Sequence, residues 1–87
     1  MSSKRRSISK SDKERALNLA NQAQDAITQG PAAEIKLHRM ALELDPSIHW
    51  SWRQLAQAYD AAGQYDMGLR CHSAEEIINK GGWVELS

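Results

Sequence analysis

Three histidines and a single cysteine are the residues of this 87-residue chain with metal-ligating chemistry. Cys71 and His72 are adjacent, and adjacent side chains of an α-helix point about 100° apart, so the pair lacks the spacing of a zinc site. His38 and His72 occupy matching positions of an internal repeat, where a ring can fill the gap between packed helices. We therefore expect structural roles for both rings, with no metal site and no cofactor.

No group of residues has the spacing of a catalytic site. The sequence contains neither the Gly-x-Ser-x-Gly turn of many hydrolases nor a glycine-rich loop that cradles phosphate groups. Aspartates and glutamates are scattered over predicted helix surfaces, where solvated charge is the ordinary explanation. We expect a protein that is not an enzyme.

The first ten residues form a basic arm of Ser, Lys and Arg around one isolated aliphatic residue, Ile8. Nothing in this stretch can bury a face, so residues 1–10 are predicted to be disordered. A solvated tail without a binding role is the simpler interpretation. The alternative is contact with a phosphate-bearing surface, which phosphorylation of Ser7 or Ser9 would weaken. The cations that would make this contact are Lys4, Arg5, Arg6 and Lys10.

The overall charge and hydropathy narrow the classes of partner. Acidic and basic residues balance at eleven each, which disfavours a dedicated nucleic-acid binder. No apolar run is long enough to span a bilayer, and the N-terminus lacks the apolar stretch of a secretory signal. One cysteine cannot form an internal disulfide, which suits a reducing compartment. These features predict a cytoplasmic location and no membrane span.

Four helix-forming segments, separated by turn residues, account for the rest of the chain. Ser11 and Glu14 have the spacing of a capping box at the start of the first helix. Its predicted buried stripe consists of Ala16, Leu19, Ala20, Ala23 and Ile27. Glycine and proline at the breaks separate helices expected over residues 11–29, 31–44, 48–62 and 65–79.

Short turns make consecutive helices antiparallel neighbours. The predicted fold class is therefore all-α, with two antiparallel helix-turn-helix hairpins in one domain over residues 11–80. Residues 81–87 form a C-terminal tail that carries Trp83. We expect this tail either to fold back on the last hairpin as a cap or to dock on a neighbouring chain.

The two hairpins are copies of one repeat of about 34 residues. The second copy contains Trp52-x2-Leu55-Ala56-x2-Tyr59, and the first copy ends in Leu44-Asp45-Pro46. These residues resemble the tetratricopeptide repeat family, whose pattern reads Trp-x2-Leu-Gly-x2-Tyr and closes on Pro. The resemblance covers about residues 13–80 and implies a fragment of an α–α superhelix.

The third helix has a packed face and an opposite, mostly polar face. Trp52, Leu55, Ala56 and Tyr59 share the packed face by the helical period. The resemblance implies that the opposite face lines a concave groove that receives a peptide. The residues predicted to bind a partner there are Trp50, Arg53, Gln54, Gln57 and Asp60, with Asn21 and Gln24 as counterparts on the first helix. A solvated polar face is the simpler alternative.

The resemblance favours a small non-enzymatic protein–protein interaction module, an adaptor or a chaperone-like protein that binds a protein or peptide segment. Two repeats fall below the roughly three usually needed for independent stability. A self-assembling structural subunit, such as a homodimer, is therefore one alternative. A nucleic-acid accessory protein acting through the basic arm is the other.

Overall fold

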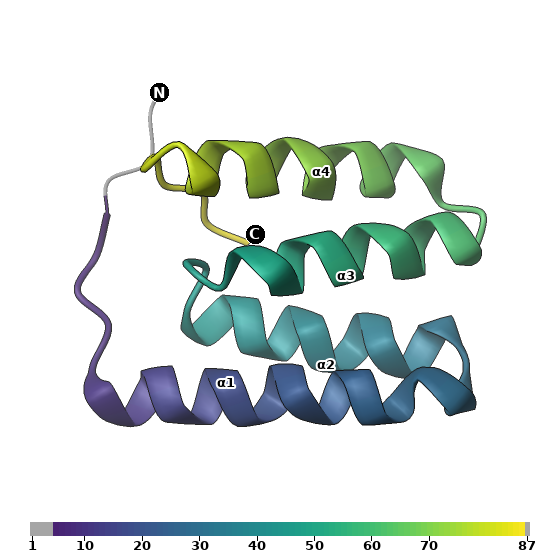
Figure 1. Cartoon of the computed structure of the whole chain (residues 1–87), viewed down its shortest axis with the longest axis horizontal. Helices are drawn as coiled ribbons and strands as arrows, with labels where there is room; N and C mark the ends of the chain where they lie inside the picture. The colour runs from purple at the N-terminus through teal and green to yellow at the C-terminus, as the bar shows by residue number, and fades with distance from the viewer. Residues whose placement is uncertain (1–4, 87) are drawn as a thin grey trace.

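The computed structural model describes residues 5–86, and all of its regular structure is helical over that range. The helices are α1 (Lys10–Asp25), the short 3-10 helix η1 (Ala26–Gln29), α2 (Pro31–Leu44), α3 (His49–Ala61) and α4 (Tyr65–Asn79). Figure 1 shows them stacked in chain order with alternating direction. The predicted all-α fold of two antiparallel helical hairpins is confirmed, and no helix in residues 5–86 is long and apolar enough to cross a membrane.

The start of α1 differs from the sequence prediction. The helix begins at Lys10 with Ser9 as its N-cap, and the Ser9 hydroxyl accepts a hydrogen bond from the Asp12 amide at 3.1 Å. This contact satisfies one of the amide donors that the first turn leaves open. The predicted capping box at Ser11 and Glu14 is therefore wrong, because Ser11 already lies inside the helix.

The end of the first helix also differs. The last four residues of the predicted first helix form the separate 3-10 helix η1, in which Ala26 is buried and Ile27 is 60% exposed. The predicted buried stripe is correct for Ala16, Ala20 and Ala23. It is wrong for Ile27, because a 3-10 turn advances each residue further around the axis than an α-turn does.

The two hairpins are joined where α3 packs against α2 and the turn that follows α2. The buried indole of Trp52 donates to the Pro46 carbonyl at 2.7 Å. Near the other end of the interface the Arg39 guanidinium donates to the Tyr59 hydroxyl at 2.9 Å. Leu42 and Leu55 are fully buried in the cluster beneath these contacts. Hydrogen bonds near both ends of the interface therefore fix the relative orientation of the two hairpins.

Two glycines shape the hairpin of α3 and α4. Gly63 ends α3 with φ +79°, a left-handed conformation that residues with a side chain rarely adopt. Gly68 lies where α3 and α4 approach closely, and a Cβ atom there would meet the Asp60 carboxylate and the Ala56 carbonyl. A small residue at position 68 therefore brings the two helices into contact.

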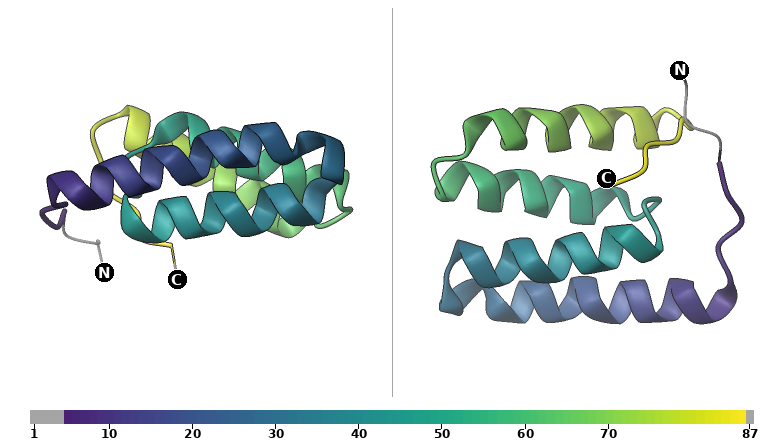
Figure 2. Two further views of the ribbon diagram at one scale, coloured as in Figure 1. Left: turned by 90° about the horizontal axis from the view of Figure 1, so that it is seen from below. Right: turned by 180° about the vertical axis from the view of Figure 1, so that it is seen from behind.

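Both ends of the chain return to the same end of the stack. The arm runs from the start of α1 along the ends of the helices toward the end of α4, and the tail turns back there toward the start of α3 (Figures 1 and 2). Val84 and Leu86 of the tail pack against the buried cluster. The tail thus folds back on the last hairpin, as one of the two sequence interpretations expected.

Candidate functional site

A groove lies beside α3, over the junction of the two hairpins. It has a volume of about 340 Å³ and is lined by Gln54, Gln57, Ala58 and Ala61 of α3, Ile27 of η1, and Pro31 and Glu34 of α2. The four α3 residues recur at the spacing of one helical face, and we call this surface the Gln57 groove. Its floor is apolar, and its polar groups are two amides and one carboxylate. Such a surface can hold an extended chain by hydrogen bonds around a nonpolar contact.

Glu34 supplies the negative charge of the Gln57 groove. The residue is only 8% exposed, and burial raises the pKa of its carboxyl. Within residues 5–86 it has no cation within ion-pair distance. It lies in the first turn of α2, where the helix dipole favours a negative charge. Sequence reasoning missed Glu34, although its place just after Gly30-Pro31 indicated a first-turn carboxylate.

Two predicted partner-binding residues of α3 point toward α4 instead of into this groove. The Arg53 guanidinium donates to the Glu75 carboxylate at 2.7 Å, and Asp60 faces the His72 ring at 3.6 Å. Both are seven residues apart on the edge of α3 that faces α4. Arg53 and Asp60 therefore do not line the Gln57 groove with Gln54 and Gln57. Partner binding by Arg53 and Asp60 stays a prediction.

Trp50 and the α1 residues also lie apart from the groove lining. The Trp50 ring is half-buried and meets the His38 ring edge to face, with ring centres 6.4 Å apart. Asn21 and Gln24 are exposed on α1. Of the seven predicted partner-binding residues, only Gln54 and Gln57 line the Gln57 groove.

His38 is fully buried between α2 and α3. Its Nδ1 atom is 2.7 Å from the Ser51 hydroxyl, and its Nε2 atom has no hydrogen-bond partner among residues 5–86. Burial lowers the pKa of this imidazole to about 4, because the charged form of the ring would lose its hydration. The expected structural role of His38 is confirmed. The same expectation for His72 is wrong, since its side chain is 45% exposed.

Cys71 is buried, and burial raises the pKa of its thiol to about 11. A thiol protonated at neutral pH is a poor nucleophile and a poor metal ligand. The described part of the chain contains no group of three His, Cys, Asp or Glu side chains placed to hold a metal ion.

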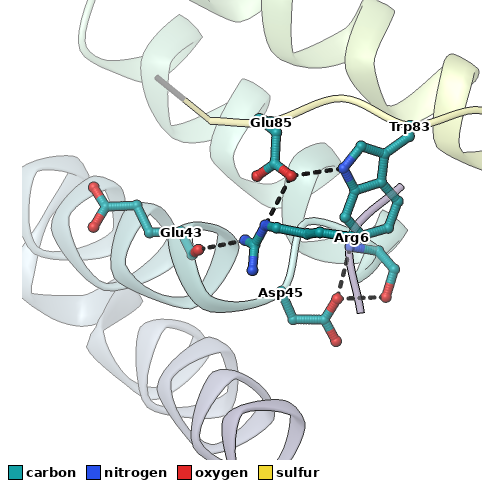
Figure 3. Close-up of polar contacts among 6 residues, drawn as sticks. Arg6, Glu43, Asp45, Trp83 and Glu85 are labelled. Carbon is teal, nitrogen blue, oxygen red and sulfur yellow. Dashed lines mark hydrogen bonds and ion pairs between the residues drawn. The ribbon is translucent and has the colours of Figure 1, made fainter. Parts of the chain in front are cut away.

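The arm and the tail meet in a polar contact that we call the terminal clasp (Figure 3). The Arg6 guanidinium donates to the Glu85 carboxylate and to the Glu43 carbonyl, each at 2.8 Å. The Trp83 indole donates to the same carboxylate at 2.7 Å. The Arg6 hydrogen bond is the main cause of the lowered pKa of Glu85. No residue spacing indicates this contact, because Arg6 and Glu85 lie near opposite ends of the sequence.

The terminal clasp gives two cations of the basic arm, Arg5 and Arg6, contacts within the chain that the sequence analysis did not predict. Arg6 is paired with a carboxylate, and the Arg5 guanidinium lies 5.2 Å from the centre of the Trp83 ring. A cavity of about 400 Å³ lies beside them, and Lys13 and Ser47 also line it. Lys10 is exposed in the first turn of α1, so ordered structure begins earlier than the predicted boundary of the arm. Lys4 lies outside the described residues.

Comparisons with protein-family models, with curated proteins and with solved structures find no match to this chain.

Proposed function

We propose that this chain is a small non-enzymatic module that binds an extended segment of a protein partner along the Gln57 groove, as an adaptor or chaperone-like protein does. The observation that carries the proposal is the apolar floor of this groove together with the polar groups of Glu34, Gln54 and Gln57. Side-chain amides can donate to and accept from a peptide backbone at once. The resemblance of the helical repeat to tetratricopeptide proteins supports the same assignment.

The position of these groups on regular helices favours binding. Gln54 and Gln57 are one turn apart on α3, and Glu34 is in the first turn of α2. Groups on packed helices lose little freedom when a ligand arrives, which lowers the entropic cost of association. A reducing compartment such as the cytoplasm suits the free thiol of Cys71 and is part of this proposal.

A random peptide library displayed on phage tests the proposal. We expect enriched peptides to bind the wild-type chain and to bind Ala61→Arg at least tenfold more weakly, because the long side chain would fill the groove. Asn18→Arg, an exposed position on α1, is the matched control and should bind normally. Failure to enrich any peptide, or equal binding by Ala61→Arg, would overturn the assignment.

Self-assembly is the second candidate, and exposed apolar residues on α4 favour it. Tyr65 and Leu69 are one turn apart and are 66% and 67% exposed. A homodimer through this face would remove them from water. Light scattering over a range of protein concentrations tests this, and Leu69→Glu should restore a monomer if the wild-type chain associates.

A further inference from the structure

The tail occupies a second groove, formed by α3 and α4 on the side away from the Gln57 groove. Trp52 of α3 and Met67, Cys71 and Ala74 of α4 line it, and we call it the tail groove. Val84 and Leu86 pack against the buried cluster there, while Glu85 between them reaches the clasp. This alternation is that of an extended chain, whose successive side chains point to opposite sides. The tail therefore shows which kind of segment this groove accepts.

The contacts that hold the tail are few. No backbone hydrogen bond joins residues 83–86 to the rest of the described chain. Val84 and Leu86 are only partly buried. The clasp is an ion pair whose side chains are 41% and 34% exposed, and exposed pairs contribute little. Opening of the tail therefore breaks no backbone hydrogen bond of the helices.

A glycine pair joins the tail to α4. Gly81 has φ +85°, and the Gly82 amide donates to the Ile77 carbonyl at 2.8 Å, which closes the end of the helix. After Gly82 the tail is anchored by side chains alone. These residues form a natural hinge, because glycine adopts many backbone conformations at little cost.

The tail does not use the whole groove. A cavity of about 200 Å³ remains beside Val84, Glu85 and Leu86. Arg70 lines this cavity, is exposed, and has no ion-pair partner in residues 5–86. A segment seated here thus has unfilled space and an unused positive charge beside it. The unfilled space would strengthen the binding of a segment with larger aliphatic groups.

We propose that the tail groove binds an extended partner segment in which two aliphatic side chains flank an acidic one, and that the chain's own tail fills the groove until such a partner displaces it. The aliphatic groups take the places of Val84 and Leu86, and the carboxylate takes the place of Glu85, where it pairs with Arg6. Release of the tail also frees Arg6 from Glu85. This site is separate from the Gln57 groove and does not depend on the function proposed above.

The first test uses the full chain with an undocked tail, Val84→Asp/Leu86→Asp, and a fluorescent synthetic peptide that copies residues 81–86. Fluorescence anisotropy should show saturable binding to this variant, and at least tenfold weaker binding to the wild-type chain, whose own tail competes. A peptide with serine in place of both aliphatic residues is the control and should not bind. Equal binding of the two peptides would overturn the proposal.

The role of Arg6 has its own measurement. In the undocked background, Arg6→Glu should weaken the copied peptide at least threefold, and a peptide with lysine in place of its glutamate should recover the loss. Arg6 is exposed, so this change leaves the core untouched. An unchanged affinity would exclude the charge contact.

A second measurement needs no variant. Amide NMR spectra of the wild-type chain, titrated with excess copied peptide, should show the tail signals moving toward those of a free chain while signals of Cys71 and Ala74 stay dispersed. Spectra unchanged at millimolar peptide would contradict the proposal. A wild-type dimer that the peptide dissociates would support the groove and identify the partner segment as the tail of a second copy.

Discussion

Buried His38 makes the stability of this protein depend on pH. The pKa of the imidazole is lowered from 6.5 to about 4 in the folded chain by burial. As the pH falls below the unfolded value of 6.5, the unfolded state binds a proton and the folded state does not, so the free energy of unfolding decreases. The stabilising contribution is complete above about pH 7 and is lost progressively toward the folded pKa of about 4.

The magnitude follows from the same shift. Between about pH 7.5 and pH 5 the unfolded chain gains close to one proton at this position, which lowers the free energy of unfolding by about 2 kcal/mol. A domain of this length has a total stability of only about 4–13 kcal/mol, so the loss is large. The side chains that contact the ring, Ser51 and Trp50, do not titrate in this pH range. The pH dependence at this position is therefore assigned to His38.

Urea unfolding, followed by circular dichroism at several pH values, measures this effect. His38→Phe and His38→Gln keep a side chain in the gap but cannot take up the proton. Each variant should be destabilised at neutral pH yet lose about 2 kcal/mol less than the wild type on going to about pH 5. His72→Gln, at an exposed position, is the matched control for general effects of histidine removal. If the free energy of unfolding changed with pH by the same amount in the wild type and in both His38 variants, the assignment to His38 would be refuted.

Three further substitutions test the fold by urea unfolding. Ser9→Ala should lower the free energy of unfolding by about 1 kcal/mol through loss of the N-cap, while Ser11→Ala, inside the helix, should cost much less; the reverse order would reinstate the predicted capping box. Leu42→Ala should cost about 2–5 kcal/mol, because Leu42 is fully buried where the hairpins meet, and a loss below 1 kcal/mol would contradict that packing. Glu85→Gln removes the charge of the clasp and should cost less than about 1 kcal/mol, so a larger loss would mean that the tail is part of the core.

The number and order of the helices could be predicted because local signals act within one turn of the chain. Gly30-Pro31 ends one helix and begins the next, and Gly63 follows the end of the third helix, both as expected. The error at Ser9 has the same local origin. Ser9 and Ser11 are both suitable caps, and only the packing of the first turn decides between them.

The sites were harder to predict because they depend on contacts between distant segments. The helical period correctly placed Gln54 and Gln57 away from Trp52, but it cannot tell which side of that face another helix will cover. Arg53 forms an ion pair with Glu75 of α4, and no residue spacing within α3 indicates this contact. The clasp between Arg6 and Glu85 depends on both termini returning to one end of the stack.

The arrangement of α3 explains why two binding surfaces can exist on so short a chain. Trp52 in the tail groove and Ala61 in the Gln57 groove lie nine residues apart, about 180° around the axis of the same helix. Ligands in the two grooves therefore meet opposite faces of α3 and do not collide. Substitutions within α3 risk disturbing both surfaces. Glu34 lines the Gln57 groove and Arg6 pairs with Glu85 of the tail, so charge changes at these two positions separate the two proposed binding activities most cleanly.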